Sequence, residues 1–209
     1  MNYAIRNSRK SHFISSQDAL NYYLNGWEIP DFYYLINEWG FRGEFDPDKD
    51  MCIGDSRTFG WGLPEHETYA HLLNCNNFGI CGAGWQTFLR VLEDWVLQNP
   101  TYNPKNIYLL ESWPSRREIK IGDEYIIWGD WLSSMFTELP KELHTDNESA
   151  NNVIREKCLR GIERICSDYK INLIYASHDK IIPSDRKAID GAHPSKNWHI
   201  DIFNYFSQQ

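Results

Sequence analysis

The sequence predicts an α/β protein in which helices cover both faces of a parallel β-sheet. From residue 51 onward, short apolar runs alternate with segments whose apolar residues recur at helical spacing, and this alternation is typical of a parallel sheet. The polar, glycine-rich loops after these runs fit strands that end at a ligand-binding edge. A chain of 209 residues also fits one domain with a single core, so we expect one domain over 1–209.

The first strand of this sheet is expected at 51–53, where an apolar run ends in Gly54, Asp55 and Ser56. Pro64, followed by two acids, begins a predicted helix over 65–73. The apolar pattern then predicts a strand at 76–80, a helix at 85–96, a strand at 107–110, a helix at 154–169, a strand at 171–176 and a helix from about 195 towards 206.

Two regions lie outside this alternation. Residues 1–48 are interpreted as an N-terminal extension with a short helix at 16–24, because Ser16 is a suitable cap. Residues 113–144 are interpreted as an insertion over the sheet edge. Alternating or apolar runs around Gly122 and Asp123 predict a hairpin there, and a short amphipathic helix is expected near 131–136.

The composition excludes several classes of function. A net charge of −8 and scattered basic residues argue against nucleic acid as a partner. No apolar run approaches the ~20 residues that span a bilayer, and the N-terminus lacks the apolar block of a secretion signal, so we expect no membrane contact and a cytoplasmic location. The five cysteines lack C-x-x-C spacing and no phosphate-binding glycine loop is present, so we expect free thiols, no metal and no cofactor. The oligomeric state stays open.

Serine chemistry is the function that the residues favour. A serine hydroxyl needs a base to take its proton and a carboxylate to orient that base. Among the seven histidines, only His193 has an acid three residues earlier, Asp190. Ser56 is therefore the candidate nucleophile, although a serine at this place can also be a turn residue or a helix cap. His178 competes with His193 because it follows the fourth strand, and we retain it as a substrate contact.

Three blocks of the sequence resemble the SGNH, or GDSL-like, hydrolase superfamily. They are Gly54-Asp55-Ser56 with the following Thr-Phe-Gly-Trp-Gly, Asn77-Phe78-Gly79-Ile80-Cys81-Gly82, and Asp190-Gly191-Ala192-His193-Pro194. The α/β-hydrolases share the chain order Ser, Asp, His, but Thr58 stands where their elbow needs glycine. The resemblance implies a flavodoxin-like three-layer α/β/α fold.

The resemblance also implies the roles of the site residues. Ser56 would be the nucleophile, His193 the base and then the acid, and Asp190 the orienting carboxylate. The backbone N–H groups of Ser56 and Gly82 would hold the oxyanion, as fixed donors suited to that charge. The third block departs from the family's Gly-x-Asn-Asp, because residues 111–116 here read Glu-Ser-Trp-Pro-Ser-Arg. Its asparagine donor is missing, and Ser112, Trp113 or Arg116 are the candidates to replace it.

Two functions follow from these residues. The first is a serine esterase that removes a small acyl group, such as acetyl, from a small-molecule or glycan ester through an acyl-enzyme, with Trp113, Arg116 and His178 as substrate contacts. The alternative is a catalytically weak or inactive SGNH-type fold that binds glycans or serves as an assembly component, such as one in a phage. An assembled pair would place Ser56 Oγ near 3 Å from His193 Nε2.

Overall fold

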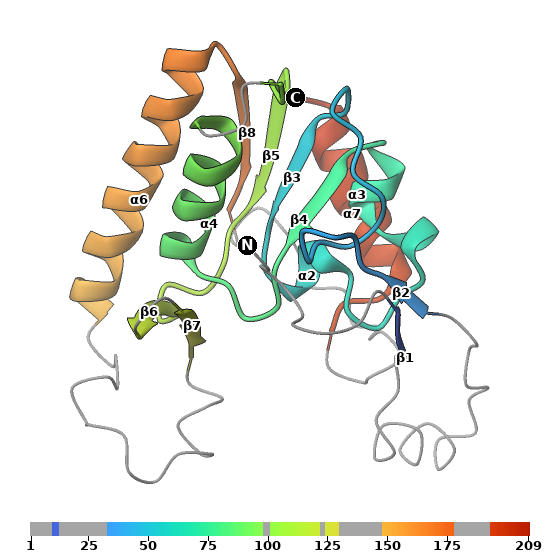
Figure 1. The fold of residues 1–209 in the computed structure, drawn as a ribbon, viewed down its shortest axis with the longest axis horizontal. Coiled ribbons are helices and arrows are strands. Elements are labelled where there is room, and N and C mark those ends of the chain that lie inside the picture. The colour runs from blue at the N-terminus through green and yellow to red at the C-terminus, as the bar shows by residue number, and fades with distance from the viewer. Residues whose placement is uncertain (1–9, 13–32, 98–100, 122–123, 130–147, 178–192) are drawn as a thin grey trace, which may run out of the picture.

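A four-stranded parallel sheet forms the centre of the computed structural model, which describes residues 10–12, 33–97, 101–121, 124–129, 148–177 and 193–209 (Figure 1). Its strands, in spatial order, are β4 (Asn76–Gly79), β3 (Met51–Gly54), β5 (Asn106–Leu110) and β8 (Asn172–Ala176). All three neighbouring pairs are parallel. Counted along the chain, this order is 2-1-3-4, as in the flavodoxin-like doubly wound sheet.

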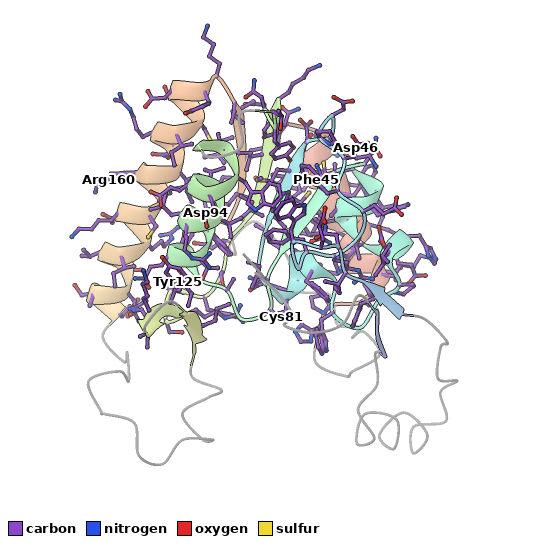
Figure 2. The ribbon with its side chains drawn as sticks, viewed as in Figure 1. Phe45, Asp46, Cys81, Asp94, Tyr125 and Arg160 are labelled. Atoms are coloured by element: carbon purple, nitrogen blue, oxygen red, sulfur yellow. The ribbon has the colours of Figure 1, made fainter. Side chains whose placement is uncertain are left out.

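Helices cover both faces of this sheet, so the predicted three-layer α/β/α fold is confirmed. One face carries α4 (Trp85–Leu92) and α6 (Glu148–Tyr169), and the other carries α3 (Tyr69–Leu72) and α7 (Lys196–Ser207), as Figure 1 shows. Arg160 on α6 points away from the sheet in Figure 2, as expected for the outer face of a covering helix.

Strand β3, in the interior of the sheet, explains why the sequence shows continuous apolar runs. Met51 and Ile53 belong to the core on the α4 and α6 side, whereas Cys52 belongs to the core on the α3 and α7 side. All three side chains are fully buried. A strand covered on both faces has no polar alternation.

The segment 65–73 differs from its predicted single helix. The structure has a 3₁₀ turn (Glu65–Glu67) followed by the short helix α3. Thr68 separates them in an extended conformation, and its hydroxyl accepts a hydrogen bond from the His71 N–H at 3.3 Å. A threonine that caps a new helix start in this way interrupts the helix before it.

The predicted helix at 85–96 also changes character part way along. The helix α4 ends at Leu92, and a turn of π-helix continues over Glu93–Leu97. The side chain of Trp95 is thereby buried among Phe41, Phe45 and Phe78 of the main core. The predicted strands 76–80, 107–110 and 171–176 and the predicted helix 195–206 are confirmed within two residues at their ends. The helix predicted at 154–169 is confirmed as α6, which begins earlier, at Glu148.

The predicted hairpin is confirmed as β6 (Arg117–Ile121) and β7 (Glu124–Trp128), paired antiparallel. An ion pair of 2.6 Å between Arg90 and Glu118 joins it to α4. A second small sheet, which the sequence did not predict, pairs β1 (Lys10–His12) with β2 (Tyr33–Leu35). The helices expected at 16–24 and 131–136 lie outside the described residues.

Two further features bear on the classes of function. No helix in the described ranges is both long and apolar enough to cross a bilayer. All five cysteines are free thiols.

Candidate active site

Ser56 lies at the carboxyl end of the central strand, as the first residue of the short helix α2 (Ser56–Phe59). Asp55 caps this helix by accepting a hydrogen bond from the Arg57 N–H at 2.9 Å. The turn needs glycine at position 54, because a Cβ there would lie 1.8 Å from Thr58 Oγ1. The local sequence thus sets a sharp strand-to-helix turn that presents the serine at the sheet edge.

His193 meets Ser56 across 137 positions of sequence. Its Nε2 lies 3.0 Å from Ser56 Oγ, a normal hydrogen-bond distance. The histidine stands just before α7, and the ring of Trp61 lies beside it at 6.4 Å between centroids. The distance is the one expected of an assembled nucleophile and base.

A pocket of about 280 Å³ opens at this contact. It is lined by Ser56, Trp61, Cys81, Gly82, Arg116 and His193. Figure 2 shows Cys81 at the carboxyl ends of the parallel strands. A doubly wound sheet binds its ligands at this edge. Burial raises the pKa of the Cys81 thiol to about 12. The thiol is therefore protonated at neutral pH.

Two backbone N–H groups of the pocket find no acceptor among the residues that the structure describes. Gly82 adopts φ = +80°, a conformation that favours glycine, in a turn closed by Ala83 N–H on Ile80 O at 3.0 Å. Within the described part of the chain, neither the Ser56 N–H nor the Gly82 N–H donates a hydrogen bond. Donors of this kind, fixed by the backbone, are available to an oxyanion.

Asp55 is a fully buried carboxylate between two arginines. It lies 2.9 Å from Arg57 Nη2 and 2.5 Å from Arg116 Nη1. Burial by itself would raise the pKa of Asp55, but the attraction of both guanidinium groups outweighs it and lowers the pKa to about 2. The carboxylate is therefore ionised at neutral pH and holds the loop around Ser56 together.

The structure separates the three candidates of the divergent third block. Trp113 is 56% exposed and is not among the residues that line the pocket. Ser112 is buried, and its hydroxyl lies 2.6 Å from the acceptor Ala83 O. Arg116 lines the pocket. Of the expected substrate contacts, the structure thus brings Arg116 to the serine and leaves Trp113 outside.

Asp190 and His178 lie outside the described residues, so the orienting carboxylate and the competing histidine stay predictions. The sequence alone did not assign Trp61 or Cys81 to the site, although each lies within one of the recognised blocks and that position was an available signal.

Arg42 is a further residue that the sequence left without a role. Its guanidinium is buried and donates to the carbonyl oxygens of Phe59, Gly60 and Leu63 at 2.8, 2.7 and 2.6 Å. The rings of Tyr34 and Phe59 lie 4.7 and 5.3 Å from its central carbon. Arg42 therefore holds in place the loop that runs from α2 past Trp61.

A buried chain of polar side chains supports the same helix from the other side. Thr58 Oγ1 lies 2.6 Å from the Tyr69 hydroxyl, and the Tyr69 N–H donates to His199 Nδ1 at 3.1 Å. Burial, with smaller effects of Arg42 and His193, lowers the pKa of His199 to about 3. This histidine is neutral at pH 7 and serves as an acceptor in the core.

Comparison with known proteins yields distant structural matches only. No family model and no curated protein matches the sequence. The chain is similar to a member of the lipolytic G-D-S-L family from Veillonella parvula, at 14% identity over 76% of this chain and 94% of the other, with a TM-score of 0.36. It is also similar to a GDSL-like lipase from Bacteroides thetaiotaomicron, at 13% identity over 78% and 87%, with a TM-score of 0.35. Likenesses this distant do not indicate a function. A functional conclusion therefore depends on the geometry of the site.

Proposed function

We propose that this protein is a serine esterase of the SGNH type that hydrolyses a small acyl ester through a covalent acyl-enzyme. The observation that carries the proposal is the 3.0 Å contact between Ser56 Oγ and His193 Nε2 inside a pocket of about 280 Å³. A weakly nucleophilic hydroxyl gains reactivity from a base at this distance. The pocket volume lies just below the range of about 300 to 1,000 Å³ that is usual for ligand sites, which suits a small acyl group.

The reaction would begin with His193 carrying its ring proton on Nδ1, so that Nε2 accepts the hydroxyl proton while Ser56 Oγ attacks the ester carbonyl carbon. The resulting oxyanion receives hydrogen bonds from the Ser56 and Gly82 N–H groups. Collapse of the intermediate breaks the bond to the alcohol oxygen, which takes the proton from His193. Water, which gives a proton to His193, then attacks the acyl-serine, and the acid leaves as Ser56 takes the proton back. Asp190 would hold the Nδ1–H, and no cofactor is required.

The alcohol side of the substrate is proposed to be a glycan or another small polar molecule. Trp61 lines the pocket beside His193 and offers an aromatic face of the kind on which sugar rings stack.

Hydrolysis of p-nitrophenyl acetate tests this proposal. The wild-type protein should turn the ester over, and Ser56→Ala and His193→Ala should each lose at least ~1,000-fold in kcat, as triad residues do elsewhere. Ser167→Ala and His71→Ala are matched controls, because both residues are exposed and lie on helices away from the pocket. Equal turnover in wild type and Ser56→Ala would refute the proposal.

A binding role without turnover is the second candidate, and the departure of the third block from Gly-x-Asn-Asp is what favours it. This role predicts saturable binding of an acetylated oligosaccharide, measured by calorimetry, that His193→Ala leaves unchanged while no acetate is released. Release of acetate by the wild-type protein would rule it out.

A further inference from the structure

We infer that Arg116 is a catalytic residue of the proposed esterase and replaces the family's asparagine as the third group that stabilises the oxyanion. This inference rests on the proposed function, because it concerns the same pocket and the same transition state. It selects one residue from the three that the divergent loop offers.

The Arg116 guanidinium contacts the residues next to both proposed oxyanion donors. Arg116 Nη1 lies 2.5 Å from Asp55 Oδ2 and 3.4 Å from Ala83 O. Asp55 precedes Ser56 in the chain, and Ala83 follows Gly82. The cation therefore touches the neighbours of both N–H donors, and it lines the same pocket as Ser56 and Gly82.

The backbone fixes this position before any substrate arrives. After β5, a turn closes with the Arg116 N–H donating to Trp113 O at 3.2 Å. The Arg116 backbone then packs on Gly84 so closely that a Cβ at position 84 would lie 2.6 Å from Arg116 O. The Arg116 side chain is 13% exposed. A cation held in this way needs little reorganisation when negative charge develops, which is the condition for effective electrostatic catalysis.

Arg116 brings a positive charge to the wall of the pocket, where its guanidinium also holds Asp55 at 2.5 Å. A cation at a largely buried site attracts a developing oxyanion more strongly than it would in water.

The other two candidates are committed elsewhere. Ser112 has a single hydroxyl proton, and Ala83 O lies 2.6 Å from its oxygen. The same oxygen is 3.1 Å from Arg116 Nη1, so Ser112 helps to hold the arginine. Trp113 is 56% exposed and lies outside the set of pocket residues. Arg116 is the residue of this loop that lines the pocket next to the nucleophile.

The test compares Arg116→Gln with Arg57→Gln in p-nitrophenyl acetate hydrolysis. Both arginines pair with the same carboxylate of Asp55, and their side chains are 13% and 14% exposed, but Arg57 is not among the pocket residues. Loss of one oxyanion donor lowers kcat by ~100 to 1,000-fold elsewhere, so Arg116→Gln should lose about that factor with little change in KM. Arg57→Gln should lose less than about tenfold, since it removes the ion pair without removing the pocket cation.

A tetrahedral inhibitor separates a catalytic role from a merely structural one. A boronic acid that adds to Ser56 carries a negative charge in the place of the oxyanion, so its inhibition constant should rise in Arg116→Gln by the same factor as kcat falls. Arg116→Lys keeps the charge without the planar fork, and it should retain intermediate activity. Thermal unfolding of each variant monitors folding.

Each outcome decides between the two proposals. If Arg116→Gln keeps kcat within tenfold of wild type, or if Arg57→Gln loses as much, the inference is wrong while the esterase proposal stands. If Arg116→Gln does not fold, Arg116→Lys decides, and a kcat equal to wild type would overturn the inference. A wild-type protein without turnover would refute the esterase proposal and this inference together.

Discussion

Arg42 provides a demanding test of how the loop after Ser56 is held in place. The substitution Arg42→Met keeps an unbranched side chain of similar length but removes three hydrogen bonds, to the carbonyl oxygens of Phe59, Gly60 and Leu63. These carbonyl groups belong to the turn that ends α2 and to the loop that carries Trp61 into the pocket. The substitution therefore tests both the stability of the fold and the support of the loop that carries Trp61.

The magnitude follows from two opposing effects. Hydrogen bonds to a charged group are worth about 1.5 to 3 kcal/mol each, so three amount to about 4.5 to 9 kcal/mol. Burial lowers the pKa of Arg42 to about 10, so keeping the charge in this place costs about 3 kcal/mol, which the substitution returns. The difference predicts a loss of about 1.5 to 6 kcal/mol in the free energy of unfolding.

Urea denaturation of wild type and Arg42→Met measures this loss. Arg164→Met is the matched control, because its side chain is 78% exposed and pairs only with Asp168 one turn along α6 among the contacts of the described chain. The control should stay within about 0.5 kcal/mol of wild type. A loss below 1 kcal/mol in Arg42→Met would show that the loop does not depend on this guanidinium, and the reasoning about its three hydrogen bonds would be wrong.

Three further substitutions make separate predictions. His199 has a pKa of about 3 in the folded protein, so between pH 6.5 and pH 3 only the unfolded chain binds a proton at this residue. The free energy of unfolding should therefore fall by about 1.4 kcal/mol per pH unit as the pH drops from 6.5 towards 3. Urea denaturation of His199→Asn at several pH values should lack this slope. Asp55, with a pKa of about 2 instead of 3.8, contributes about 2 kcal/mol that is present above pH 3.8 and lost as the pH falls towards 2, so the deficit of Asp55→Asn at pH 7 should shrink in that range. Asp190→Asn should lower kcat for p-nitrophenyl acetate by ~1,000 to 10,000-fold, and an unchanged kcat would exclude it as the orienting carboxylate.

Much of the fold could be predicted because burial leaves a clear pattern in the sequence. Strand β3 is covered on both faces, so Met51, Cys52 and Ile53 are all apolar. The prediction failed at 65–73 for a local reason, since Thr68 can either continue a helix or cap a new one. Apolar periodicity does not distinguish these two uses.

The candidate site was predictable to the extent that topology controls it. Carboxyl ends of parallel strands share one edge, so Ser56 after β3 and Gly82 after β4 had to approach each other. The partner His193 came from its spacing to an acid and from the resemblance of its block. The choice among Ser112, Trp113 and Arg116 depended on how one short turn aims its side chains, which residue types do not reveal. The role of Arg42 could not be predicted because its partners are backbone carbonyl groups, which leave no pattern in the sequence.

Mass spectrometry of the protein during turnover tests the central claim most directly. A slowly hydrolysed p-nitrophenyl ester or a serine-reactive fluorophosphonate should add one group to the intact chain, and peptide sequencing should place it on Ser56. The 3.0 Å contact with His193 predicts that His193→Ala reacts at least ~100-fold more slowly. Turnover with the label on another residue, or with no covalent intermediate under rapid quenching, would contradict a mechanism in which Ser56 is the nucleophile.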